Sequence, residues 1–301
     1  MYARPFPVRF LRFGCLLLAL NVMIPAENAP GQSGKLTVLR VGSTGNLTGK
    51  TDSSQEKAGA ETLRSFIKEE TGLDNEIIGQ QPWREVADKL AKGQIDLGVF
   101  QGYEYAWAQE RNPEVKPLAV GINRYRYPVA CVLTKRDNPA MGFSDLKGQA
   151  LILPISGQTC LRLFVERSCE ASHQKPAAFF SKITFADNVE DALDDIVDGG
   201  GQAIVIDQAG LDAYKQRKPG RFKQLKEVAR SQPFPPIVVA YCGSALDENT
   251  RGKFKDALLN ADRKEKGEML LTLSRLSAFE AVPEDFAKVL EATRKRYPKE
   301  D

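Results

Sequence analysis

Short apolar runs alternate with segments of helical period along most of the chain. The apolar runs are rich in β-branched residues and end at glycine, proline or polar turns, which is typical of buried strands. In chain order these predicted strands are 36–41, 75–78, 95–100, 129–133, 150–153, 182–185, 203–206 and 237–241. Between them apolar residues recur at helical spacing, as at Trp83, Val86, Ala87 and Leu90 before Gly93. The alternation of strands and helices predicts parallel sheets in an α/β fold.

Two stretches of the chain, Val86–Phe100 and Val189–Asp207, are weakly similar. Each has a helical pattern, then a Gly-Gln turn, then a short apolar strand. With 301 residues the chain is long enough for two lobes, and the repeat predicts that their topologies are alike. From Asp247 onward the pattern is almost wholly helical, so we expect a helical C-terminal tail.

Two proline-containing segments lie between the predicted halves. Asn123–Pro128 and Pro233–Pro236 are predicted to be hinge strands that connect the lobes. We therefore expect one lobe to comprise residues 35–126 together with 237–301, and the other to comprise residues 127–236.

The N-terminus has the layout of a secretory signal peptide. Three arginines precede the apolar stretch Cys15–Ala26, and a region of small and polar residues follows it. The apolar stretch is too short for a comfortable membrane span. Cleavage after Ala26 and cleavage after Gly31 both fit, so residues 1–31 are expected to be removed. The mature protein is therefore predicted to be periplasmic.

Composition and charge argue against several classes of function. The chain is 42% hydrophobic and 27% charged, with a net charge of +3. Its basic clusters are interleaved with glutamate, proline or apolar residues, so no nucleic-acid partner is expected. His173 is the single histidine, and the cysteine spacing does not resemble a metal site, so we expect neither a metal nor a cofactor.

Four cysteines lie beyond the predicted signal peptide, and export permits disulfides. Cys160 and Cys169 fall on one predicted helix, where nine residues span about 13 Å, too far for a bond. Cys131 and Cys242 lie in two similar predicted strands and are the more plausible pair. Four cysteines allow three connectivities, and the sequence leaves the choice among them open.

A polar turn made of Ser156, Gly157, Gln158 and Thr159 connects the predicted strand 150–153 to a helical pattern. A helix start exposes unpaired N–H groups and the positive end of the helix dipole. Together with hydroxyl and amide side chains, such a start suits an anion or another small polar group. The alternative is that Ser156 or Thr159 only caps the helix.

The loop Thr44–Thr51, T-G-N-L-T-G-K-T, is one residue short of a phosphate-binding loop. Because the preceding strand ends at Gly42, the loop comes late for that motif, and an exported protein meets little nucleoside triphosphate. We therefore do not assign an NTPase. Ser43 and Thr44 are still expected to face a ligand, because they lie at a strand end.

Four segments occur in an order and spacing that are together fairly specific. They are G-Q-I-D-L-G-V-F-Q-G-Y-E-Y-A at 93–106, Y-P-V-A-C-V-L-T-K-R-D-N-P at 127–139, S-D-L-K-G-Q-A-L-I-L-P-I-S-G-Q-T at 144–159 and G-G-Q-A-I-V-I-D at 200–207. On these segments the chain resembles the phosphonate-, phosphite- and phosphate-binding periplasmic receptors of ABC importers. That resemblance implies a two-lobe type II periplasmic-binding-protein fold.

The resemblance also implies roles for individual residues. The turn that ends at Thr159 would grip an oxyanion from the second lobe, while Gly102 and Tyr103 would close on it from the first lobe. Asp207, at the end of a later strand, would meet an amine on the ligand. The alternatives are that Tyr103 only packs against its neighbours and that Asp207 only caps the next helix.

Two departures from the family pattern bear on the ligand. Gln158 interrupts the usual Ser-Thr-Ser-Gly turn, and Asp187-Asn188 stands where the family often has a histidine. A dianionic phosphonate would lose a proton donor there and gain a negative charge nearby. The expected ligand is therefore a small anion or zwitterion, phosphonate- or phosphate-like in chemistry.

We expect an exported, monomeric solute-binding protein rather than an enzyme. Hinge closure around the ligand would produce the form recognised by an ABC permease or by the ectodomain of a sensor kinase. The alternative is an exported enzyme that uses the same interlobe cleft. Its reactive group would be Cys160, with a thiol pKa lowered by the helix start.

Overall fold

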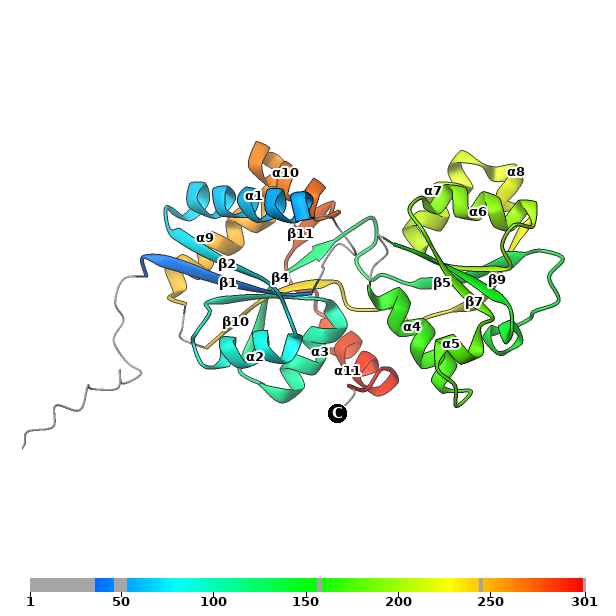
Figure 1. The fold of residues 1–301 in the computed structure, drawn as a ribbon. Helices are drawn as coiled ribbons and strands as arrows, with labels where there is room; N and C mark the ends of the chain where they lie inside the picture. Colours follow the sequence, from blue (N-terminus) through cyan, green and yellow to red (C-terminus); the bar gives the residue numbers. More distant parts are fainter. Residues whose placement is uncertain (1–35, 46–52, 156–158, 244–245, 300–301) are drawn as a thin grey trace, which may run out of the picture. The chain divides into compact units, whose positions relative to one another are not determined.

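The computed structural model describes residues 36–45, 53–155, 159–243 and 246–299, and these form two β-sheets flanked by helices (Figure 1). The first sheet has the strand order β11-β4-β10-β3-β1-β2. Its strands are β1 Val38–Thr44, β2 Asp74–Gln81, β3 Leu97–Phe100, β4 Val115–Ile122, β10 Ile237–Cys242 and β11 Ala278–Glu280. Strand β1 pairs in parallel with β2 and β3, whereas β10 runs antiparallel to β3 and β4.

The second sheet has the strand order β7-β6-β8-β5-β9. Its strands are β5 Ala130–Lys135, β6 Ala150–Pro154, β7 Lys182–Ala186, β8 Ala203–Asp207 and β9 Leu225–Arg230. Strand β6 is parallel to β7 and β8, and β5 is antiparallel to β8 and β9. Both sheets are therefore mixed rather than wholly parallel.

Helices bury both faces of each sheet. Around the first sheet lie α1 Ser53–Thr71, α2 Trp83–Ala91, α3 Gly102–Arg111, α9 Glu248–Leu259, α10 Glu265–Leu273 and α11 Phe286–Arg296. Around the second lie α4 Thr159–Glu170, α5 Pro176–Phe179, α6 Val189–Asp198, α7 Gln208–Arg217 and α8 Pro219–Phe222. Short 3-10 helices occupy Phe143–Leu146 and Ala261–Arg263.

The buried apolar residues explain which helix covers which face. Phe66 of α1, Phe254 of α9 and Leu270 of α10 share one cluster with the first sheet. On its other face, a second cluster contains Val86 of α2 and Phe286 of α11. Each of these helices carries apolar residues three or four positions apart, so one stripe can be removed from water.

The structure confirms the predicted α/β fold with two sheets and a helical C-terminal region, but it corrects two details. Strands β4, β9 and β11 were not predicted. Strand β4 contains Pro117 and Gly121 and lacks a period of two, and its register with β10 shifts opposite Pro117. The crossing segments 123–129 and 231–236 have irregular backbone rather than strand.

The predicted signal peptide, residues 1–31, lies outside the described residues. Within the ranges that are described, no helix is both long and apolar enough to cross a membrane.

Candidate functional site

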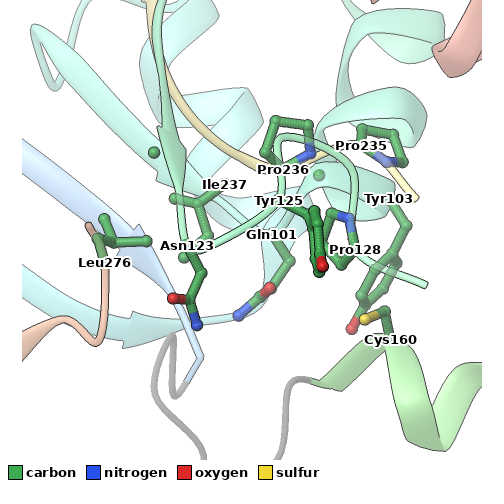
Figure 2. Close-up of a pocket in the computed structure, with 12 residues that line it drawn as sticks. Gln101, Tyr103, Asn123, Tyr125, Pro128, Cys160, Pro235, Pro236, Ile237 and Leu276 are labelled. Atoms are coloured by element: carbon green, nitrogen blue, oxygen red, sulfur yellow. The ribbon is translucent and has the colours of Figure 1, made fainter. Parts of the chain in front are cut away.

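A small pocket lies where β3 and β4 end and α3 and α4 begin (Figure 2). Its described lining is Gln101, Gly102, Tyr103, Gly121, Asn123, Tyr125, Pro128, Cys160, Pro235, Pro236, Ile237 and Leu276. The volume is about 30 Å³, enough for about two water molecules. Predicted site residues Ser156, Gly157 and Gln158 lie outside the described residues, although the chain continues from them directly into α4. Sequence reasoning identified Gly102 and Tyr103 but missed Gln101, Asn123 and Tyr125.

Gly102 lets the start of α3 approach the second crossing segment. A Cβ atom on Gly102 would lie 2.0 Å from the carbonyl oxygen of Pro235 and 2.4 Å from that of Pro236. Backbone atoms cannot rotate away as a flexible side chain can, so any other residue would push the two segments apart. Gly102 therefore contributes to the pocket through its backbone. The family resemblance implied that Gly102 lies at the site, but not that it allows this close approach.

The start of α3 is satisfied by the protein's own side chains. The backbone N–H of Gln101 donates to Glu104 Oε2 (3.3 Å) and to Thr44 Oγ1 (3.4 Å), and the Thr44 hydroxyl donates to Glu104 Oε2. Thr44 is fully buried, so its predicted place facing a ligand is not what the structure shows. Burial raises the pKa of Glu104, and the bonds from Thr44 and Gln101 oppose that rise. Glu104 was missed, although a glutamate at the third helical position is a known capping signal.

Tyr103 of α3, beside the first sheet, lies near Thr159 of α4, beside the second sheet. The Tyr103 ring packs edge-on against Trp107, with 5.0 Å between ring centroids. Burial raises the pKa of the Tyr103 hydroxyl, and nearby Thr159 opposes part of the rise, so the hydroxyl stays protonated at neutral pH. The Thr159 hydroxyl is itself buried, and although Tyr103 approaches it, no described residue makes a hydrogen bond of good geometry to it. Thr159 therefore does not cap α4 through its side chain.

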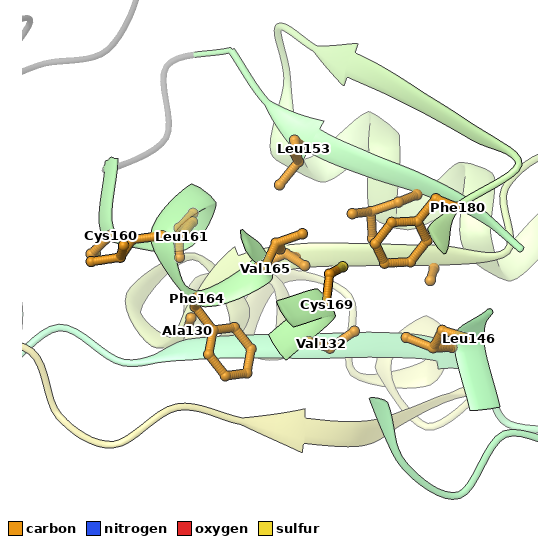
Figure 3. Close-up of a cluster of buried hydrophobic side chains, with 14 of the residues drawn as sticks. Ala130, Val132, Leu146, Leu153, Cys160, Leu161, Phe164, Val165, Cys169 and Phe180 are labelled. Atoms are coloured by element: carbon orange, nitrogen blue, oxygen red, sulfur yellow. The ribbon is translucent and has the colours of Figure 1, made fainter. Parts of the chain in front are cut away.

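Cys160 follows Thr159 and is packed into an apolar cluster with Leu161 and Val165 (Figure 3). Only 4% of Cys160 is exposed, and burial raises the pKa of its thiol, with a further contribution from the negative charge of Asp207. A reactive thiol needs a lowered pKa and access to solvent. The structure thus removes the physical basis of the alternative in which Cys160 serves as a nucleophile.

The proposed pairing of Cys131 with Cys242 is wrong. Cys131 lies on β5 of the second sheet, Cys242 ends β10 of the first, and both are free and buried. Burial raises the pKa of Cys131 to about 12. Similarity of two strands in sequence does not place them in one sheet, which is why the pattern misled.

Asp207 caps α7. Its Oδ1 accepts a hydrogen bond of 2.6 Å from the backbone N–H of Gly210, and burial raises the pKa of the carboxyl. The start of α6 is capped in the same way by Asn188, whose Oδ1 accepts from the N–H of Glu190 at 2.8 Å. The capping interpretation of Asp207 is therefore correct, although the charge on Asp207 is still felt at Cys160 beside the pocket.

Ser43 does not line this pocket. It borders a larger cavity on one face of the first sheet. Among the described residues there is no group of three or more His, Cys, Asp or Glu side chains that could hold a metal ion.

The sequence matches a known protein family over most of its length. Residues 48–286 match the family of ABC transporter phosphonate periplasmic substrate-binding proteins, and the chain belongs to this family. It is thus a periplasmic substrate-binding protein of the ABC transporter class and not an enzyme. A comparison with curated proteins gives no match.

Solved structures of similar fold agree with this assignment. XAC2383 from Xanthomonas citri, bound to chloride ion, has a TM-score of 0.60 at 16% identity, over 87% of this chain and 97% of that chain. PhnD1 from Prochlorococcus marinus (MIT 9301), in complex with methylphosphonate, has a TM-score of 0.57 at 13% identity, with coverages of 86% and 98%. A binding protein component of an ABC phosphonate transporter from Pseudomonas aeruginosa has a TM-score of 0.53 at 13% identity, with coverages of 87% and 88%. At these identities the likeness establishes the fold alone.

Proposed function

We propose that this protein captures a small anionic or zwitterionic ligand, phosphonate- or phosphate-like, and delivers it to an ABC permease. The ligand would bind at the pocket that Tyr103 and Cys160 line and that Thr159, next to Cys160, adjoins, here called the Tyr103–Thr159 pocket. The observation that carries the proposal is that the Thr159 hydroxyl is buried and has no well-formed hydrogen bond to any residue that the structure describes. A buried hydroxyl that lacks a partner is costly, so a native structure rarely keeps one without a reason. A ligand oxygen at this position would supply the missing bond.

The groups around Thr159 favour an oxyanion. Helix α4 is twelve residues long, and the positive end of its dipole lies at its start, where a negative charge is stabilised. Tyr103 adds a second hydroxyl donor, because a tyrosine is protonated at neutral pH and burial raises its pKa further. Gln101 and Asn123 add amide groups to the described lining. These donors are all neutral, which favours a singly charged or zwitterionic ligand over a dianion.

Asp207 supports the zwitterionic form of the ligand. Its carboxyl caps α7 through Oδ1, and its charge adds to the raised pKa of Cys160, the residue that follows Thr159. A cationic amine on the ligand would gain from that charge. A ligand with a phosphonate at one end and an amine at the other would thus meet Thr159 and Tyr103 with one end and Asp207 with the other.

The mechanism that follows is hinge closure of two lobes. We place one lobe at residues 35–126 with 237–301 and the other at 127–236, with the ligand stabilising the closed state by binding it more tightly. The protein would act as a monomer after removal of residues 1–31. The permease would recognise the closed state, whereas a sensor kinase ectodomain remains the alternative partner.

Titration calorimetry of the mature chain tests the proposal. Methylphosphonate, 2-aminoethylphosphonate, phosphate, phosphite and methylsulfonate form the panel. Thr159→Val and Tyr103→Phe should each weaken binding of the best ligand about tenfold, the effect expected for one hydrogen bond to a charged group.

Thr134→Val is the matched control. The Thr134 hydroxyl is also buried without a partner among the described residues, but it lies on β5, whereas Thr159 is next to the pocket-lining residue Cys160. It should leave affinity unchanged. The proposal fails if no compound in the panel binds, or if Thr159→Val and Thr134→Val have equal effects.

A further inference from the structure

A cavity of about 570 Å³ lies between the first sheet and helices α1, α9 and α10. Side chains from all of these elements line it, and most are apolar, among them Leu63, Leu97, Val239, Phe254, Leu258 and Leu270. Protein interiors have few voids larger than a water molecule. A volume of this size instead falls in the range of about 300 to 1,000 Å³ that is typical of small-molecule sites.

The sequence of α1 leaves room over the cavity. Two of the lining residues on α1, Gly59 and Ala60, are the two smallest amino acids. A Cβ atom on Gly59 would meet nothing within 4 Å. The following turns of α1 are held to α10. The Thr62 hydroxyl lies 3.6 Å from the Met269 sulfur, and Glu70 pairs with Lys264. The middle and the end of α1 are thus held to the α10 region.

The polar groups of the cavity are cationic or neutral. Lys57 and Arg275 are exposed lining residues, and none of the described lining residues is acidic. Arg275 and Gln80, another lining residue, have φ of +54° and +57°. The value at Arg275 belongs to the left-handed residue that ends α10, where the N–H of Leu276 donates to the Leu271 carbonyl oxygen.

We propose that this cavity binds an amphipathic acid, an unbranched hydrocarbon chain that ends in a carboxylate. The hydrocarbon lies among the apolar side chains, because burying it there removes it from water. The carboxylate lies at Lys57 and Arg275, the cationic part of the lining. This site is separate from the Tyr103–Thr159 pocket and does not depend on which ligand that pocket takes.

A displacement assay on the mature chain tests the assignment. The probe is 8-anilinonaphthalene-1-sulfonate, and the competitors are octanoate, decanoate, dodecanoate and dodecanol, each below its micelle-forming concentration. Affinity should rise about fourfold for each added methylene, as expected for burial of a CH₂ group. Lys57→Glu should weaken dodecanoate about fivefold and leave dodecanol unchanged, because only the acid loses a charge partner.

Two control variants localise the effect to this cavity. Ala60→Phe should fill the space and weaken dodecanoate about tenfold, whereas Ala91→Phe, on α2 and outside the cavity lining, should not. Lys92→Glu, an exposed residue beside Ala91, controls for the charge change at Lys57. If Ala60→Phe does not fold, the chain-length series and Lys57→Glu together still test whether the cavity binds an amphipathic acid.

The inference is overturned if no carboxylate displaces the probe, if affinity is independent of chain length, or if dodecanol and dodecanoate respond alike to Lys57→Glu. Methylphosphonate binding, measured separately, should be the same in all four variants. If the native chain binds none of the phosphonate panel, the proposed function fails, but the cavity assignment is unaffected.

Discussion

The starts of helices α3 and α4 both border the pocket, but their polar groups are satisfied in different ways. At α3 the donors and acceptors are taken up within the protein, since Glu104 and Thr44 bond to each other and to the backbone of Gln101. At α4 the Thr159 hydroxyl is buried with no partner among the described residues. The polar groups at the α3 start are therefore satisfied within the protein, whereas the α4 start is the side at which we propose that a ligand binds.

Because of this difference, we expect changes at the α3 start and at Thr159 to affect different measured quantities. Residues at the α3 start should change the free energy of unfolding when they are altered, because they bond to the protein itself. Thr159 should change ligand affinity and leave stability nearly untouched, because a hydroxyl without a partner contributes no bond to the folded state. Three predictions sharpen or break this distinction, from the largest expected effect to the smallest.

The largest effect is expected for Gly102→Ala. The added methyl group would lie 2.0 Å from the Pro235 carbonyl oxygen, so α3 and the crossing segment must move apart. We expect a loss of about 3 kcal/mol in the free energy of unfolding, measured by urea denaturation, as for severe overpacking. Gly252→Ala is the control, because a Cβ there meets nothing within 4 Å and alanine favours the helix. Equal stability of the two variants would contradict the close approach.

A smaller loss is expected for Thr44→Val. This change removes the hydroxyl that donates to Glu104 and accepts from the Gln101 N–H, so we expect about 1 to 2 kcal/mol of destabilisation. Thr159→Val is the paired variant and should change the unfolding free energy by less than about 0.5 kcal/mol, because no bond within the protein is lost. The comparison between the two helix starts is broken if Thr159→Val costs as much as Thr44→Val.

The smallest effect concerns pH. Burial raises the pKa of Glu104 in the folded state above its ordinary value near 4.5. Between those two values the folded state holds a proton that the unfolded state has lost, so stability falls as pH rises from 4.5. Glu104→Gln should remove this contribution and give a smaller drop in urea midpoint between pH 4.5 and pH 7. The same change at the exposed Glu248 should leave the profile of the native chain unaltered.

Much of the fold could be predicted because burial leaves a local pattern. Strand β8 reads A-I-V-I-D and helix α6 has its apolar residues three or four positions apart, so each could be recognised in isolation. Strands β9 and β11 escaped because they lie at sheet edges, where one row of backbone groups is unpaired and side chains need not be apolar. The direction of β10 escaped because the antiparallel pairing depends on where the chain returns.

The site could be predicted only in outline. The family resemblance predicted that Gly102, Tyr103 and Thr159 share one site. In the structure Gly102 and Tyr103 line one pocket, and Thr159 precedes its lining residue Cys160. The sequence and the resemblance did not distinguish residues that bind a ligand from residues that cap a helix. Asp207 and Thr44 have the same chemistry as ligand-binding residues, and only their partners, Gly210 and Glu104, define their roles.

By itself the sequence determined the class of fold, the apolar stripe of each helix, the layout typical of a signal peptide and the family to which the chain belongs. Tertiary structure alone decided which polar groups are satisfied, that Cys131 and Cys242 lie on different sheets, and that a large apolar cavity lies under α1. The physical reason is the separation along the chain of the residues that interact. Helix and strand periodicity reflects burial within a few residues, whereas the contact between Thr44 and Gln101 spans 57 residues and depends on how whole elements pack.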